Sequence, residues 1–143
     1  MCFQLLRKPP VVNADSISPH SSERIELAEL NGLLVASAPS ATIWMADNWK
    51  YLCKWDDVAL FLAQDETNKA EYIAEEHDCD DFSFRLKGQF SVPAWSALAL
   101  GICWTTTHAL NCFVCEDRRL WFIEPQTDAI TETLDEEICV LII

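Results

Sequence analysis

A cysteine with acidic neighbours marks the stretch 75–90, where a helix is expected to begin. Acidic residues surround Cys79, Arg85 and Lys87 follow, and Gly88 is expected to end the helix. The free amides of a first helical turn and the positive end of the helix dipole favour thiolate over thiol, which makes such a cysteine a candidate nucleophile. The alternative is a small buried residue beside a helix cap, the usual state of a free cysteine.

A nucleophilic cysteine needs a base and a group that orients the base. His108 opens a predicted strand, residues 108–115, and the next predicted strand, residues 119–124, ends at Glu124. If these strands pair antiparallel, His108 and Glu124 lie at the same end, so the carboxylate can hold the imidazole. Taken singly, each residue has a structural alternative. His108 can be a turn histidine whose hydrogen bonds are satisfied, and Glu124 can be a solvated residue at a strand end. Together with Cys79, they predict a thiol site.

The elements that must position these residues change in type along the chain. Apolar spacing predicts a short helix over residues 23–34 and another over residues 55–64, with extended aromatic structure between them. Beyond Pro93 the pattern becomes β, and the predicted strands are residues 97–104, 108–115, 119–124 and 138–143. Helices followed by a mostly antiparallel sheet predict an α+β fold in a single domain, residues 1–143.

The charge balance narrows the classes of partner. The 143 residues hold 10 basic and 23 acidic side chains, a formal net charge of −13. A nucleic acid needs a basic face, so we expect no nucleic-acid partner. Residues 88–115 lack charged side chains, but polar residues interrupt the run, which predicts two core strands and no membrane span.

Cysteine usage and the N-terminus bear on location. Seven cysteines, an odd number with scattered spacing, do not resemble a disulfide framework and favour a reducing compartment. The first ten residues lack the pattern of a secretory signal. We expect a cytoplasmic protein, or one exported without a recognisable signal peptide.

Four short motifs carry a resemblance to a known family. They are Asp-Cys-Asp-Asp-Phe at 78–82, Lys-Gly at 87–88, His-Ala-Leu-Asn at 108–111 and Glu-Pro-Gln-Thr-Asp at 124–128. In these motifs residues 43–132 resemble the agglutinin-related papain-like cysteine protease domain, the C-terminal domain of the Marasmius oreades agglutinin and its small phage and bacterial relatives. Residues 1–42 lie outside the resemblance and have no assigned role.

The resemblance implies a papain-like fold, with the nucleophile helix packed on a mostly antiparallel sheet, and a calcium-dependent Cys-His-Glu triad. Cys79 would be the nucleophile, His108 the base and Glu124 the orienting group, and we assign Gln126 and Trp104 to the substrate or oxyanion region. The implied function is a cysteine hydrolase that cleaves an amide bond in a protein or a cell-wall peptide. The alternative is a non-catalytic binding or accessory protein of phage type that retains the fold and a metal site.

The acidic residues around Cys79 also suggest calcium. Their charges would oppose a thiolate unless a cation neutralised them, and carboxylate and amide oxygens suit a hard cation. Asp80, Asp81 and Gln126 are the candidate ligands. The alternative is that these acids only cap and solvate the helix start. Zinc at Cys112 and Cys115 is disfavoured, since residues three apart on a strand point to opposite faces.

Overall fold

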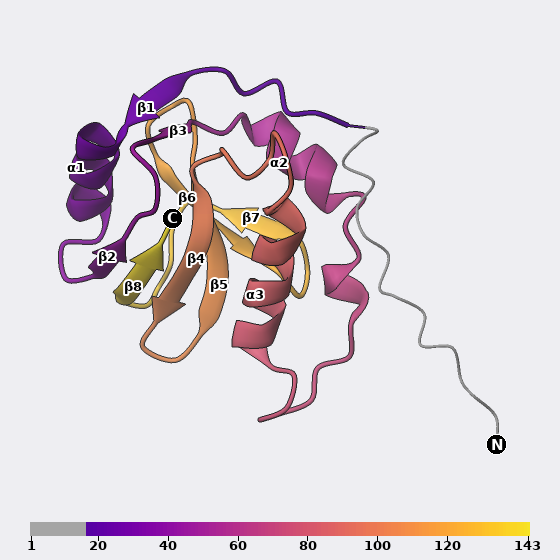
Figure 1. Ribbon diagram of the computed structural model, residues 1–143. Coiled ribbons are helices and arrows are strands. Elements are labelled where there is room, and N and C mark those ends of the chain that lie inside the picture. Colours follow the sequence, from indigo (N-terminus) through magenta and orange to yellow (C-terminus); the bar gives the residue numbers. More distant parts are fainter. Residues whose placement is uncertain (1–16) are drawn as a thin grey trace.

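The computed structural model describes residues 17–143, which form a central sheet with helices on both sides (Figure 1). The elements in chain order are β1 (Arg24–Glu26), α1 (Leu27–Ser37), β2 (Thr42–Trp44), β3 (Trp49–Tyr51), α2 (Trp55–Leu62), a 3-10 turn η1 (Thr67–Lys69), α3 (Cys79–Phe90), β4 (Leu100–Thr105), β5 (Ala109–Val114), β6 (Leu120–Glu124), β7 (Ala129–Thr131) and β8 (Ile138–Ile142).

The main sheet has six strands in the order β2-β8-β4-β5-β6-β7. All its neighbouring pairs are antiparallel except β2 with β8, which run parallel. A separate antiparallel pair joins β1 to β3. Every residue of β5 is buried, so β5 is the interior strand of the fold and has no solvent face.

Alternation along β5 divides the core in two. Leu110, Cys112 and Val114 belong to a cluster on the α1 side of the sheet, which includes Leu30 and Leu34. The other residues of β5 point to the face that α2 and α3 cover. There Phe113 packs in a second cluster that includes Phe61 of α2, and Leu86 and Phe90 of α3. Period-two alternation in a strand covered on both faces produces this division.

Helix α3 begins where the sequence predicted and ends two residues later than predicted. The Asp78 side chain accepts from a first-turn amide while Asp81 reaches back to the amide of Asp78, which is a capping box. Gly88 does not end the helix, which runs on to Phe90. The ring of Phe90 stacks on Phe61 with centroids 3.7 Å apart, and this burial extends the helix past the glycine.

The predicted fold class needs correction. The resemblance implied an α+β, papain-like fold with the nucleophile helix packed on a mostly antiparallel sheet, but residues 17–143 are rich in sheet, with eight strands and three α-helices of 8 to 12 residues. The three-residue strand β1 falls in the stretch predicted as helix, while β2 and β3 lie in or next to the stretch predicted only as extended or irregular structure. They are too short to show an alternating pattern, and their pairing partners lie elsewhere in the chain.

The core also extends beyond residues 43–132. Ile25 and Leu34 precede that range, Leu141 follows it, and all three are buried in the same cluster. The predicted strands within 88–115 are confirmed as β4 and β5. In the part of the chain that the structure describes, every helix is too short or too polar to traverse a bilayer.

Gly101 on β4 lies against the backbone of β8. A Cβ at this position would overlap the carbonyl oxygen of Ile142. We therefore expect Gly101→Ala to lower the free energy of unfolding by about 2 kcal/mol or more, because backbone atoms cannot move aside as a side chain can. Gly32→Ala in α1, where a Cβ meets nothing within 4 Å, should instead raise it by about 0.5–1 kcal/mol. Urea denaturation of both variants measures this contrast; equal stability would contradict it.

Asp57 on α2 anchors the segment that precedes β1. Its buried carboxylate accepts hydrogen bonds from the backbone amides of His20 at 2.7 Å and Ser21 at 2.8 Å, and from the Ser21 hydroxyl at 2.8 Å. Burial opposes ionisation of Asp57, but the hydrogen bonds from Ser21 and His20 outweigh it and hold the pKa below the ordinary value.

Because this folded-state pKa is lowered, the ionised carboxylate stabilises the fold above the ordinary pKa of aspartate, and that stability is lost as pH falls through the lower folded value. Asp57→Asn should cost about 2 kcal/mol at pH 7, and the difference from wild type should shrink below about pH 4. Urea denaturation across that range is the measurement. Asp56→Asn, an exposed neighbour in the same helical turn, is the control and should change little.

Candidate functional site

His108 and Glu124 lie together at the edge of the sheet where β5 begins and β6 ends. The Nε2 atom of His108 is 2.6 Å from Oε2 of Glu124, and both side chains are about 30% exposed. The second carboxylate oxygen of Glu124 accepts from the backbone amide of Gln126 at 3.1 Å. Glu124 is therefore held on one side by the turn that follows it, and the imidazole is held by Glu124.

The turn before His108 is held by Glu136. The Glu136 carboxylate accepts hydrogen bonds from the hydroxyl of Thr105 at 2.5 Å and from the hydroxyl of Thr107 at 2.7 Å. These hydrogen bonds hold the pKa of Glu136 below its ordinary value. The hydroxyl of Thr105 in turn accepts from the amide of His108 at 3.0 Å. The segment before β8 thus fixes the backbone that carries His108.

Cys79 is the first residue of α3 and is half-buried. Figure 1 shows the start of α3 at the same end of the sheet as the β4–β5 turn. Buried Asn111 ties helix and sheet, since its amide donates to the carbonyl oxygens of Ser83 at 3.0 Å and Gly101 at 3.1 Å. Within residues 17–143 no hydrogen bond joins the Cys79 thiol to His108. The roles assigned to Cys79, His108 and Glu124 stay predictions.

The predicted calcium ligands are grouped differently from expectation. Ligand atoms of Asp78, Cys79 and Asp80 lie within 4.8 Å of one another. The side chains of Asp78 and Asp80 hydrogen-bond each other, which raises the pKa of Asp80 and lowers that of Asp78. Asp81 instead completes the capping box. These contacts explain the acidic residues as parts of a helix start.

Trp104 and Gln126, assigned to the substrate or oxyanion region, have structural contacts. The Trp104 ring meets Phe84 of α3 edge-on, with centroids 5.6 Å apart. The backbone amide of Gln126 is held by Glu124. The structure thus places Trp104 on the face of the sheet that α3 covers, and Gln126 in the turn beside His108 and Glu124.

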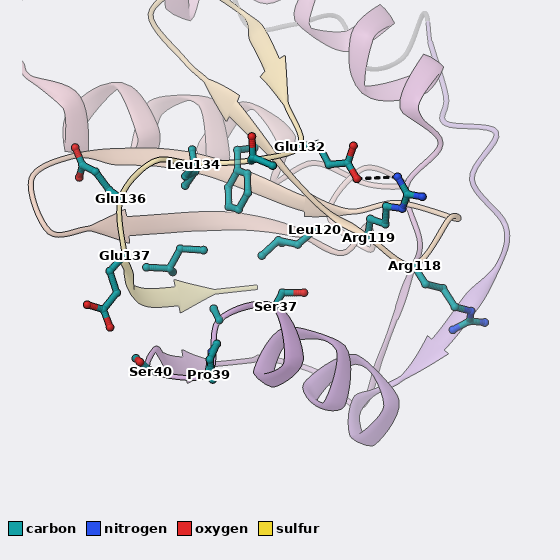
Figure 2. Close-up of a pocket in the computed structure, with 14 residues that line it drawn as sticks. Ser37, Pro39, Ser40, Arg118, Arg119, Leu120, Glu132, Leu134, Glu136 and Glu137 are labelled. Carbon is teal, nitrogen blue, oxygen red and sulfur yellow. Dashed lines mark hydrogen bonds and ion pairs between the residues drawn. The ribbon is translucent and has the colours of Figure 1, made fainter.

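A groove with a volume of about 540 Å³ lies on the α1 side of the sheet (Figure 2). It lies between the end of α1 and the segment that leads into β8. Leu120, Phe122, Leu134 and Ile138 give it an apolar floor. Polar side chains surround this floor: Ser37, Ser40, Arg118, Arg119, Glu132, Thr133, Glu136 and Glu137.

Ion pairs occupy both arginines of the groove. Arg119 pairs with Glu132 at 2.7 Å, as Figure 2 shows, and Arg118 pairs with Glu23 at 2.9 Å and with Glu29. Glu137 is exposed, and its carboxylate makes no such pair within residues 17–143. The free charge of the groove is therefore negative.

Sequence reasoning missed this groove. Its residues come from the end of α1, from β6 and from the segment before β8, and none of these carries a motif. The burial of Asp65 and Thr67 was missed as well. The sequence holds little signal for this burial, because a buried acidic residue and an exposed one look alike in a sequence.

Two solved structures share the fold. One is described as a PSL1a–E64 complex, with a TM-score of 0.76 and 19% identity over 86% of this chain and 52% of that chain. The other is Polyporus squamosus lectin bound to the human-type influenza-binding epitope Neu5Aca2-6Galb1-4GlcNAc, with a TM-score of 0.73 and 19% identity over 86% and 50%. This chain thus spans about half the length of either. Neither a family model nor a curated protein matches the sequence.

These neighbours are structures of a lectin, and they overturn the assignment of the chain to the agglutinin-related papain-like cysteine protease domain. The prediction that the chain is an amide hydrolase, or thiol protease, depended on that assignment and is overturned with it. Three of the four short motifs misled because each has a structural use. Residues 78–81 form a capping box, Asn111 ties α3 to β4, and Glu124 accepts from its own turn.

The predicted thiol site still makes a measurable claim. Burial raises the pKa of Cys53 and Cys112 well above the ordinary value, and that of Cys103 to about 12. Cys79 should therefore be alkylated by iodoacetamide at neutral pH before any of these three. If His108 activates it, His108→Ala should slow Cys79 by about tenfold or more.

Mass-mapped labelling gives the rate of each cysteine separately. Exposed Cys139 supplies the rate of an ordinary accessible thiol, and His77→Ala controls for loss of a histidine near Cys79. Labelling of Cys79 no faster than Cys139, and unchanged in His108→Ala, would make the His108–Glu124 pair a purely structural contact.

Proposed function

We propose that this chain is a non-catalytic binding module whose groove binds a carbohydrate. The observation that carries the proposal is the fold it shares with a lectin, one structure of which holds a glycan epitope. The proposal adopts the second of the two hypotheses raised by the sequence, and it needs no activated thiol.

The groove has the chemistry that sugar recognition uses. A sugar ring presents apolar C–H faces and a rim of hydroxyls, so its site combines apolar surface with a few placed polar groups. Leu120 and Phe122 offer the apolar floor. Ser40 and Glu137, which Figure 2 labels, line the same groove and supply polar groups. A volume of about 540 Å³ accommodates a short oligosaccharide.

Charge distinguishes the expected ligand from the sialylated epitope of the lectin structure. Both arginines of the groove are already paired, and Glu137 leaves it negative. The whole chain carries −13. A negative surface repels anionic ligands, so a neutral glycan fits this groove better than a sialylated one.

Ser40→Trp tests the site. Ser40 is exposed at the groove, so the indole should fill the space above the floor and weaken glycan binding by about tenfold or more without unfolding the protein. Ser91→Trp, at the exposed end of α3, is the matched control. A glycan array on the full chain identifies the ligand, and calorimetry on wild type and both variants compares affinities.

The expected result is binding of neutral glycans in preference to sialylated ones, lost in Ser40→Trp and kept in Ser91→Trp. If neither class of glycan binds, carbohydrate recognition is refuted. If a glycan binds equally well to Ser40→Trp, the groove is the wrong site.

A further inference from the structure

An apolar surface extends across three strands on the face of the sheet where α3 lies. Ile142 of β8 pairs with Ile102 of β4 on one side and with Trp44 of β2 on the other. Directly paired residues of neighbouring strands point to the same face of a sheet. Ile102 also pairs with Asn111, whose amide reaches the carbonyl oxygen of Ser83 in α3. Trp44 and Ile142 therefore point to the α3 side.

Helix α3 covers only part of this face. It packs against β5 and β4, and Figure 1 shows β8 and β2 on the far side of β4 from the helix. Trp44 is 66% exposed, Ile142 is 40% exposed, and Phe84 on α3 is 52% exposed. The half-buried Trp104 of β4 meets Phe84 edge-on and pairs with Val140 of β8. We call these five residues the shelf; a patch of this kind on a soluble protein usually marks an interaction site.

The open part of the sheet has the width of one helix. The two strands β8 and β2 span about 10 Å, at roughly 4.8 Å each, and helices packed side by side lie about 8–10 Å apart. The five residues of β8 are about 17 Å long, which matches about eleven helical residues, or three turns. Helices are a usual cover for the face of a sheet. One helix of about three turns beside α3 would therefore complete the layer.

Lys87 places a positive charge beside the shelf. It follows Phe84 by three residues on α3, so the two side chains are neighbours on the helix surface. Lys87 is half-buried and makes no ion pair within residues 17–143, whereas the nearby Lys50 pairs with Asp47 at 2.8 Å. Burial, and then the charge of Lys50, lower the pKa of Lys87. An ammonium group in this state gains from a carboxylate supplied by a partner.

We propose that the shelf binds an amphipathic helix of another protein, which lays its apolar face on Trp44, Ile142 and Phe84 and places a carboxylate beside Lys87. Apolar side chains at positions i, i+3, i+4 and i+7 of such a helix would cover the shelf. The groove proposed for carbohydrate lies on the α1 side of the sheet, the opposite face. This inference therefore does not depend on the carbohydrate proposal.

Two other occupants fit the shelf less well. A second copy of this chain offers no free helix among residues 17–143, because α1, α2 and α3 each bury a face in their own fold. Two copies would also bring together two net charges of −13. The same charge opposes docking on an anionic lipid surface. An acidic helix meets the charge of Lys87 and supplies the missing layer.

The test selects binders to the full chain from a phage-displayed library of random peptides of about 16 residues. Selected peptides should carry apolar residues at helical spacing and an acidic residue at one flank. The strongest binder is then synthesised with a fluorescent label, and anisotropy gives its affinity. Trp44→Ser should weaken binding by about tenfold or more, because Trp supplies the largest apolar contact. Trp55→Ser removes a Trp that is 41% exposed on α2 and should bind as wild type does.

A charge exchange tests the role of Lys87 separately. Lys87→Glu should weaken the selected peptide by about tenfold, and a second peptide in which Lys replaces the acidic flank residue should recover most of the loss. Lys69→Glu changes the net charge equally at an exposed site on η1 and should leave both affinities close to those of wild type. A lysine that only supports the fold would give no such recovery. Thermal unfolding of each variant checks that it is folded.

Three results would overturn the proposal. One is the failure of the library to yield any peptide that binds wild type more tightly than Trp44→Ser. Another is a set of selected peptides that alternate apolar and polar residues as a strand does, which would place the partner on the free edge of β2. The last is a wild-type dimer in sedimentation analysis that dissociates in Trp44→Ser, which would make a second copy the occupant.

Discussion

The burial of β5 on both faces is the constraint on which the rest of this structure depends. A strand with no solvent face needs cover above and below, and α1 on one side and α2 with α3 on the other provide it. The polar side chain of this strand, Asn111, donates hydrogen bonds from its amide nitrogen to carbonyl oxygens of α3 and β4. These hydrogen bonds fix the position of α3 along the sheet, in addition to the apolar packing that buries the helix.

Polar chemistry is displaced to the ends of the strands by the same constraint. His108 meets Glu124 where β5 begins and β6 ends, Glu136 holds the β4–β5 turn, and Asp128 follows β6. An acid that is withdrawn from water needs hydrogen-bond donors or a cation to balance its charge. Glu136 and Glu124 have donors. Asp65 and Asp128 each keep one buried carboxylate oxygen without a hydrogen-bond partner.

The short motifs predicted a function that the structural comparisons contradict, and the geometry explains why these motifs are a weak guide. A capping box, a bridging amide and a turn-binding carboxylate satisfy the backbone in any protein of this shape. They are required whether or not a thiol reacts nearby. A fold, in turn, carries many functions, so the carbohydrate proposal depends on the groove and its charge as well as on the likeness to a lectin.

The sequence by itself determined the elements whose pattern is local. Helices α2 and α3 and strands β4, β5, β6 and β8 follow from apolar periodicity, and the meeting of His108 with Glu124 follows from a hairpin between neighbouring strands. Only the tertiary structure decided the parallel pairing of β2 with β8, the groove, and the approach of Asp65 to Asp128. These join segments far apart in the chain, where burial selects the partner and no local pattern records it.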